Sequence, residues 1–145
     1  MAVMKVLFVC RGNVGRSQMA ASFYNQFSQT HSADSAGTYV ERPGQTLLER
    51  RRERPGRSFV VDAMLEVGLD IEGSVSTQIT NDMPGKYDKV VSMAGRQYTP
   101  KWLSDAPNYV YWKVRDPMGR SYATTVHARD IIRQKVIDLV QSEAA

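Results

Sequence analysis

The sequence predicts an α/β fold, with one parallel sheet and helices on both of its faces, in a single domain that covers residues 1–145. Two observations carry this prediction. Short apolar runs rich in β-branched residues alternate with segments whose apolar residues recur every three or four positions. Such alternation is typical of parallel sheets, because each connection between parallel strands has to cross a face of the sheet, usually as a helix.

Each expected element follows from a local pattern, and glycine or proline bounds most of them. In chain order we expect a strand over residues 4–9, a helix over 16–29, a strand over 33–36, a long loop over 38–57 with a helical turn at 45–51, a helix over 58–67 with Ser58 as its N-cap, an extended segment over 74–79, a strand over 87–93, a short helix over 100–104, a strand over 109–114 and a helix over 123–141. The last helix is expected to pack through an apolar face that includes Ile131, Ile132 and Val136.

The composition is that of a globular protein. Apolar residues make up 42% of the chain and charged residues 23%. No apolar run approaches the length of a membrane span, and the first run, broken by Lys5, is too short for a secretory signal. The single cysteine rules out an internal disulfide framework, which favours a reducing compartment. We therefore expect a cytoplasmic protein without a membrane partner.

The formal net charge is +4, and much of the excess lies in the basic segment from Glu49 to Arg57. A modest positive field attracts anionic substrates. A basic run can also mark a nucleic-acid patch, but no aromatic platform or base-reading motif accompanies this one. We expect a solvated loop or helix end here and no nucleic-acid partner.

The most informative segment runs from Val6 to Ser17 and contains Cys10, the only cysteine of the chain. It has the pattern of a buried strand, a glycine-bearing turn and the start of a helix. Such a turn points several backbone N–H groups into one small space, and the helix start adds a partial positive charge. We expect the Cys10 thiol at the floor of this space and the Arg16 guanidinium at its rim. This arrangement predicts a site for a tetrahedral oxyanion such as a phosphoryl group or arsenate.

The other residues of the turn suit attack by sulfur. The thiolate is the nucleophile, and the helix start, the turn amides and the Ser17 hydroxyl would each favour it. Arg16 offers a planar fork that can grip two substrate oxygens, which lysine cannot. Gly12 and Gly15 permit close approach of the backbone, and Asn13 tolerates a left-handed conformation and can brace the loop.

Asp116 is the candidate general acid. It follows an expected strand, as Cys10 does, and the carboxyl ends of parallel strands meet at one edge of the sheet. Pro117 biases Asp116 towards an extended backbone. The carboxyl could protonate the leaving group and later activate the water that releases the sulfur-bound intermediate.

The segment from Val9 to Ser17 resembles the signature V-C-x-G-N-x-x-R-S of the low-molecular-weight protein tyrosine phosphatase family, whose superfamily also contains thioredoxin-coupled arsenate reductases. The run from Ser35 to Thr38 and the Asp-Pro pair at Asp116 extend the resemblance, and the run from Gln18 to Ala20 looks more like the reductase branch. The resemblance implies a three-layer sandwich around a four-stranded parallel sheet.

It also implies a phosphatase that hydrolyses phosphotyrosine, in a protein or in a related small aryl phosphate, through a thiophosphate and without a metal or other cofactor. Cys10 matches the nucleophile, Arg16 the phosphate clamp and Asp116 the general acid. The residues that match the phosphate-binding loop are Arg11, Gly12, Asn13, Val14, Gly15, Arg16 and Ser17.

Some positions depart from the family pattern. Gly15 stands where many relatives have a second cysteine, and the two resolving cysteines of the reductases have no counterpart here. Met118 stands where aromatic residues often follow the Asp-Pro pair. Arg11, at a position that lines the family's pocket mouth, and the segment from Arg50 to Arg57 would both favour an extra negative charge on the substrate.

Other functions stay open on the sequence alone. The second hypothesis is an arsenate reductase in which an external thiol or a partner protein resolves the adduct on Cys10. The third is an oxyanion sensor without catalysis. Cys10 could also be an inert buried thiol, and Asp116 only a turn residue.

Overall fold

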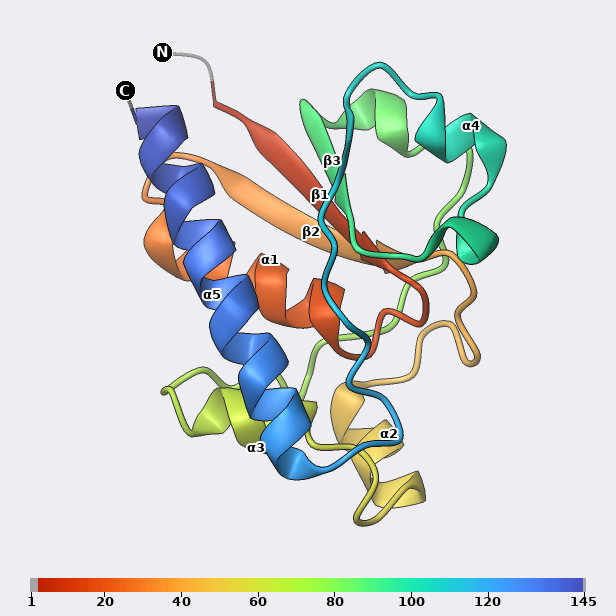
Figure 1. The fold of residues 1–145 in the computed structure, drawn as a ribbon, viewed down its shortest axis with the longest axis vertical. Coiled ribbons are helices and arrows are strands. Elements are labelled where there is room, and N and C mark those ends of the chain that lie inside the picture. The colour runs from red at the N-terminus through yellow and green to blue at the C-terminus, as the bar shows by residue number, and fades with distance from the viewer. Residues whose placement is uncertain (1–2, 145) are drawn as a thin grey trace.

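The structure is a computed structural model that describes residues 3–144, and its centre is a sheet of four parallel strands (Figure 1). The strands are β1 (Lys5–Cys10), β2 (Ser32–Gly37), β3 (Lys89–Ser92) and β4 (Tyr109–Tyr111), in the order β2-β1-β3-β4. Strand β1 pairs with β2 on one side and with β3 on the other. The expected four-stranded parallel sheet is therefore confirmed.

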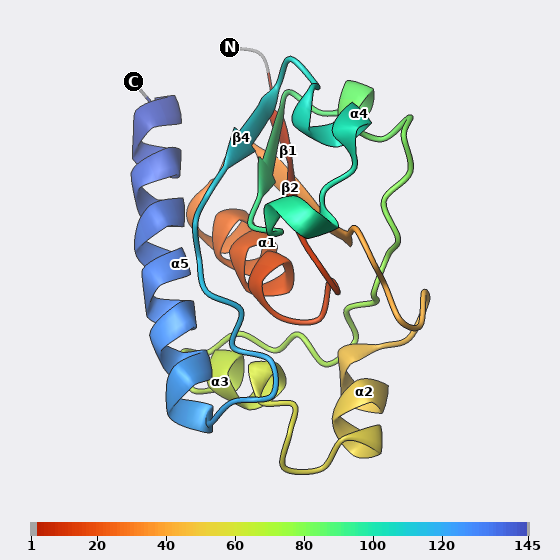
Figure 2. The ribbon, with the colours of Figure 1, turned by 45° about the vertical axis from the view of Figure 1, so that its right-hand side comes forward.

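Helices lie on both faces of this sheet. The helices are α1 (Arg16–Phe27), α2 (Leu47–Glu53), α3 (Val60–Leu65), α4 (Lys101–Ser104) and α5 (Tyr122–Ala144), with short 3-10 turns at Pro84–Lys86 and Arg96–Tyr98. Helices α1 and α5 cover one face and α4 the other, while α2 and α3 lie beyond the carboxyl ends of the strands (Figure 2). None of the helices within residues 3–144 has the length and apolar character of a membrane span.

The core is divided in two by the sheet, because β1 is buried on both of its faces, as in other parallel sheets. Phe8 points to the side of α1 and α5, where its ring lies 5.8 Å from that of Tyr24 and 5.7 Å from that of Trp112. Leu7 points to the opposite side and packs in the cluster that contains Leu103 of α4. This double burial explains why the sequence of β1 is a continuous apolar run.

The segment between β2 and α3 is more regular than the sequence suggested. Helix α2 begins at a capping box, in which the Thr46 hydroxyl accepts a hydrogen bond from the Glu49 N–H and the Glu49 carboxylate accepts one from the Thr46 N–H. Helix α3 has Phe59 rather than Ser58 at its N-cap, without a side-chain cap, and ends at Leu65 instead of Val67. The expectation for Ser58 was therefore wrong.

The packing face of α5 also differs from the expected one. Ile131 is 37% exposed, whereas Ile132 and Val136 are fully buried as expected. Arg129 is buried, and its Nη1 donates to the Ala63 carbonyl at 2.8 Å. This contact joins α5 to α3. The buried face of α5 therefore includes the polar side chain of Arg129, whereas the sequence pattern predicted an apolar face.

The end of β1 lies where the order of the strands reverses. The connection that follows β1 leads to β2 on one side, and the next strand in the chain, β3, pairs on the other. The loop after β1 therefore lies at the point where open α/β sheets bind their ligands. Gly37, at the end of β2, approaches this loop so closely that a Cβ there would lie 2.8 Å from the Arg11 carbonyl oxygen and 2.9 Å from the Asn13 nitrogen.

Gly37→Ala is expected to lower the free energy of unfolding by about 1–3 kcal/mol, because backbone atoms of the loop cannot move aside as a flexible side chain can. Urea denaturation measures the change. Gly73→Ala is the matched control, since no atom lies within 4 Å of a Cβ at that position. A Gly37→Ala protein as stable as the control would contradict the close approach.

Candidate active site

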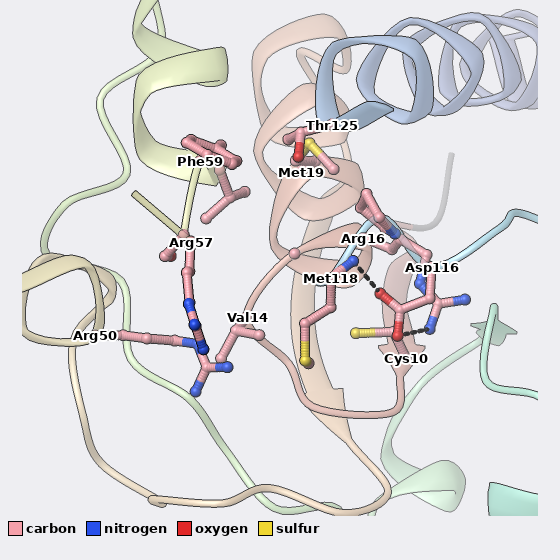
Figure 3. Close-up of a pocket in the computed structure, with 14 residues that line it drawn as sticks. Cys10, Val14, Arg16, Met19, Arg50, Arg57, Phe59, Asp116, Met118 and Thr125 are labelled. Carbon is pink, nitrogen blue, oxygen red and sulfur yellow. Dashed lines mark hydrogen bonds and ion pairs between the residues drawn. The ribbon is translucent and has the colours of Figure 1, made fainter. Parts of the chain in front are cut away.

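The Cys10 side chain points into a loop formed by residues 11–15, which connects β1 to α1. The side chain is only 3% exposed, and its Sγ lies 3.0 Å from the Ser17 Oγ. The Asn13 N–H donates to the same sulfur at 3.3 Å. The sulfur thus accepts a backbone hydrogen bond, and Cys10 is one of the residues that line the cavity shown in close-up in Figure 3. Cys10 is therefore not packed into the apolar core alone, as an inert thiol would be.

Asn13 braces the loop from within. Its φ of 54° is left-handed, as the sequence analysis expected for an asparagine in this turn. The buried side-chain Nδ2 donates to the Ser17 Oγ at 2.7 Å and to the Ser35 Oγ at 2.9 Å. Because the Ser17 oxygen accepts from Asn13, the Ser17 proton is free to be donated to the Cys10 sulfur.

Residues that the sequence analysis did not assign to the site hold the loop from outside. The Gln18 Nε2 donates to the Asn13 carbonyl at 3.1 Å and to the Val75 carbonyl at 3.0 Å. The Ser76 Oγ donates to the same Asn13 carbonyl, and the Thr77 N–H donates to the Asn13 Oδ1 at 2.8 Å. The extended segment over residues 74–79 thus serves as an outer wall of the loop. No local pattern distinguishes these polar residues from ordinary loop residues.

Arg16 lies deeper than the rim position that the sequence suggested. The residue is 6% exposed, and its Nη1 donates to the carbonyls of Met93, at 2.5 Å, and Val114, at 2.8 Å. These carbonyls follow β3 and β4, so two neighbouring strands fix one side of the guanidinium. The other terminal nitrogen, Nη2, lies 3.6 Å from the Asp116 Oδ2.

Asp116 is both a turn residue and a cavity residue. Its Oδ1 accepts a hydrogen bond from the Met118 N–H at 3.0 Å, while its Oδ2 faces Arg16. The carboxylate is about two-fifths exposed, and the residue lines the same cavity as Cys10 (Figure 3). A carboxylate held at this edge could exchange protons with a group bound above the sulfur.

The remaining loop residues divide between two adjoining hollows. Val14 and Gly15 line the cavity of Cys10, Arg16 and Asp116. Arg11 and Gly12 instead line a neighbouring hollow with Tyr39, and the Arg11 guanidinium lies 4.0 Å from the centre of the Tyr98 ring. The structure thus brings the predicted catalytic residues together but turns the Arg11 side chain away from the sulfur. Residues of the cavity that the sequence analysis did not single out as site residues are Met19, Ser58, Phe59, Val60 and Thr125.

The chain is similar in sequence and in fold to known proteins. The chain is 32% identical over 139 residues to a glutaredoxin arsenate reductase from Synechocystis, a match that covers 94% of this chain and 95% of that protein. The solved structure of an arsenate reductase in the phosphate-binding state superposes with a TM-score of 0.76 at 28% identity, and covers 97% of this chain and 98% of the other.

A low-molecular-weight protein tyrosine phosphatase from T. tengcongensis has the same fold, with a TM-score of 0.79 at 22% identity over 96% of this chain and 99% of the other. The family described as low molecular weight phosphotyrosine protein phosphatase matches residues 5–144. Because this match spans nearly all of the sequence, the chain belongs to the low-molecular-weight phosphotyrosine protein phosphatase family.

Proposed function

We propose that this protein is a cysteine-dependent phosphatase that hydrolyses phosphotyrosine or a related aryl phosphate monoester. The observation that carries the proposal is the placement of one thiol, one buried guanidinium and one accessible carboxylate around a single cavity. The Cys10 sulfur accepts a hydrogen bond from the Asn13 N–H at the end of β1, and Asp116 lines the same cavity. A nucleophile and a proton donor are thus available without a second thiol.

In the first step, the Cys10 Sγ attacks phosphorus, and an S–P bond forms as the bond to the aryl oxygen breaks. The loop N–H groups and Arg16 hold the non-bridging oxygens, whose charge is redistributed in the transition state. Asp116 donates a proton to the leaving oxygen. In the second step, Asp116 takes a proton from water, the water oxygen bonds to phosphorus, and the S–P bond breaks to release phosphate.

The resemblance to the Synechocystis reductase favours a second candidate, an arsenate reductase that uses external thiols. Cys10 would displace a hydroxyl of arsenate to form an S–As bond. An external thiol would then attack the Cys10 sulfur, so that a mixed disulfide forms while the S–As electrons reduce arsenate to arsenite. A second external thiol would restore Cys10, since this chain has no other cysteine.

Cys10→Ser is expected to abolish phosphate release from an aryl phosphate, because the hydroxyl is a far weaker nucleophile than the thiolate. Asp116→Asn is expected to lower kcat by about 10²–10⁴-fold, since the amide cannot protonate the leaving oxygen. Asp105→Asn removes an exposed carboxyl at the end of α4 and should leave turnover intact. Full activity of Cys10→Ser would rule out the proposed mechanism.

Arsenate is expected to act on the wild-type protein as a competitive inhibitor of aryl phosphate hydrolysis, because it fits the same loop as phosphate. The assay follows phosphate release together with consumption of an added thiol, with and without a glutaredoxin. Arsenite that forms in proportion to the thiol consumed, with negligible ester hydrolysis, would select the reductase. Cys10→Ser provides the blank for both reactions.

A further inference from the structure

Two arginines of the basic segment face the cavity from the side opposite Cys10. Arg50 of α2 and Arg57, which follows α2, both line it, and their guanidinium groups converge beside Val14 (Figure 3). Val14 and Met118 lie between this pair and the sulfur. The cavity therefore has a cationic end in addition to the loop that surrounds Cys10, and the chemistry of the proposed phosphatase does not use it.

The fold fixes Arg50 firmly in this position. The capping box at Thr46 and Glu49 sets the start of α2, and Leu47 is fully buried one turn before Arg50. Arg50 itself is only 6% exposed. Burial of so large a cation is costly unless negative charge compensates it.

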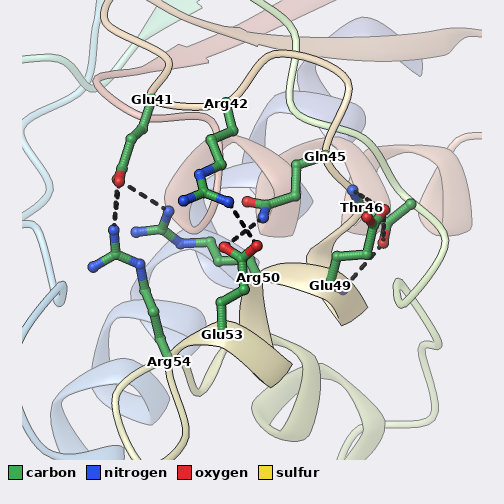
Figure 4. A network of polar contacts seen from close by, with 8 residues as sticks. All are labelled: Glu41, Arg42, Gln45, Thr46, Glu49, Arg50, Glu53 and Arg54. Atoms are coloured by element: carbon green, nitrogen blue, oxygen red, sulfur yellow. Dashed lines mark hydrogen bonds and ion pairs between the residues drawn. The ribbon is translucent and has the colours of Figure 1, made fainter.

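The positive charge of Arg50 is only partly neutralised by an acidic side chain of the same chain. Its Nη1 lies 3.5 Å from the Glu41 Oε2, whereas both oxygens of Glu41 accept hydrogen bonds from Arg54 at 2.7 Å (Figure 4). One carboxylate thus serves two guanidinium groups and is held more tightly by Arg54. Burial and, after it, the charge of Arg54 lower the pKa of Arg50 from its ordinary value, as expected for a cation that lacks a full partner.

Arg57 has no acidic side chain within ion-pair distance among residues 3–144. A turn places it, in which the Arg57 N–H donates to the Arg54 carbonyl at 3.0 Å and Gly56 has a φ of 73°. Of the arginines that do not line the cavity of Cys10, Arg42 is paired with Glu53 at 2.6 Å and Arg51 with Asp62 at 3.5 Å. Arg52 has no ion pair within the described residues 3–144, but it is exposed to solvent and lies away from the cavity. Arg50 and Arg57 are therefore the incompletely paired arginines of this region that meet the cavity.

We propose that Arg50 and Arg57 form a second anion subsite, which binds a carboxylate or phosphate carried by the substrate beside its phosphorylated ring. This inference rests on the proposed function and names its substrate class, an aryl phosphate with a second anionic group. The side chains of Val14 and Met118 lie between the two anion sites and provide an apolar surface for the ring. In a protein substrate, the second group is an acidic side chain adjacent in sequence to the phosphotyrosine.

The test compares two phosphotyrosyl peptides that differ only in glutamate or glutamine at the residues flanking the phosphotyrosine. We expect the wild-type protein to hydrolyse the glutamate peptide with a kcat/KM roughly three- to tenfold higher, as for one or two charge-assisted contacts at a partly exposed site. Arg57→Gln and Arg50→Gln should each bring this ratio towards one. Arg57 is exposed, so its substitution keeps the test valid if Arg50→Gln fails to fold.

Arg52→Gln is the matched control, because Arg52 is an exposed arginine of the same helix and does not line the cavity. It removes one positive charge and should keep the wild-type ratio. A ratio that falls equally in Arg52→Gln and Arg57→Gln would reveal only long-range attraction and overturn the subsite. Equal kcat/KM for the two peptides in the wild-type protein would rule out an acidic residue beside the phosphotyrosine as the second group, and would overturn the subsite if the small esters described next show no preference either.

A second arm uses small esters, with 3-carboxyphenyl phosphate compared with phenyl phosphate. A preference for the carboxylated ester that is lost in Arg57→Gln supports the subsite. If the two peptides show no such preference, this result assigns the subsite to small substrates. Phenyl phosphate reports on the proposed function alone. If the wild-type protein hydrolyses it but prefers no anionic partner, this inference fails and the phosphatase stands; if no ester is hydrolysed, the proposed function fails.

Discussion

The site depends on the hydrogen bonds that converge on Asn13. Its backbone N–H donates to the Cys10 sulfur, its carbonyl accepts from Gln18 and Ser76, and its side chain joins Ser17 to the neighbouring strand and the outer wall. All these groups are buried or nearly so, and an unpaired polar group there would be costly. The left-handed conformation of Asn13 lets them be satisfied together. The amide groups are therefore in place before any oxyanion arrives, which is the condition for electrostatic stabilisation of a transition state.

Much of the fold could be predicted from the sequence because burial and periodicity coincide in its central elements. Strand β1 has an apolar run and is buried on both faces, and α1 follows a glycine turn. Prediction was weaker at the edge of the sheet, where β4 ends at Tyr111 rather than Val114 and exposes Val110 and Tyr111. An apolar pattern reports propensity, whereas burial depends on what packs against the strand. Only one helical turn over residues 45–51 was expected within a polar, basic loop, although Thr46 and Glu49 have the spacing of the capping box that begins α2.

The candidate site also has a part that could be predicted from the sequence and a part that could not. Cys10, Asn13, Arg16 and Ser17 are close in sequence, so one strand-turn-helix pattern was enough to expect them together. Ser76, Thr77 and Gly37 support the loop through contacts between segments far apart in the chain, and Gln18 ties Asn13 to the distant Val75. The runs around Gln18 and Gly37 carried part of the family resemblance, but no strand or helix pattern indicates these contacts. Charge alone predicted similar roles for Arg11 and Arg50. Packing separates them, because Arg11 lies over the Tyr98 ring while Arg50 is drawn inward one turn after Leu47.

Gly15 and the solitary sulfur also have a consequence for oxidative damage. Once Cys10 is oxidised to a sulfenic acid, it has no second thiol in this chain with which to condense. Reduction of the sulfenic acid then requires a thiol compact enough to reach the sulfur of a residue that is only 3% exposed, or a protein that can bind over the cavity. Without such help, further oxidation to the sulfinic and sulfonic acids is irreversible by ordinary reductants. The redox state of the surrounding medium therefore sets how long the protein keeps its nucleophile.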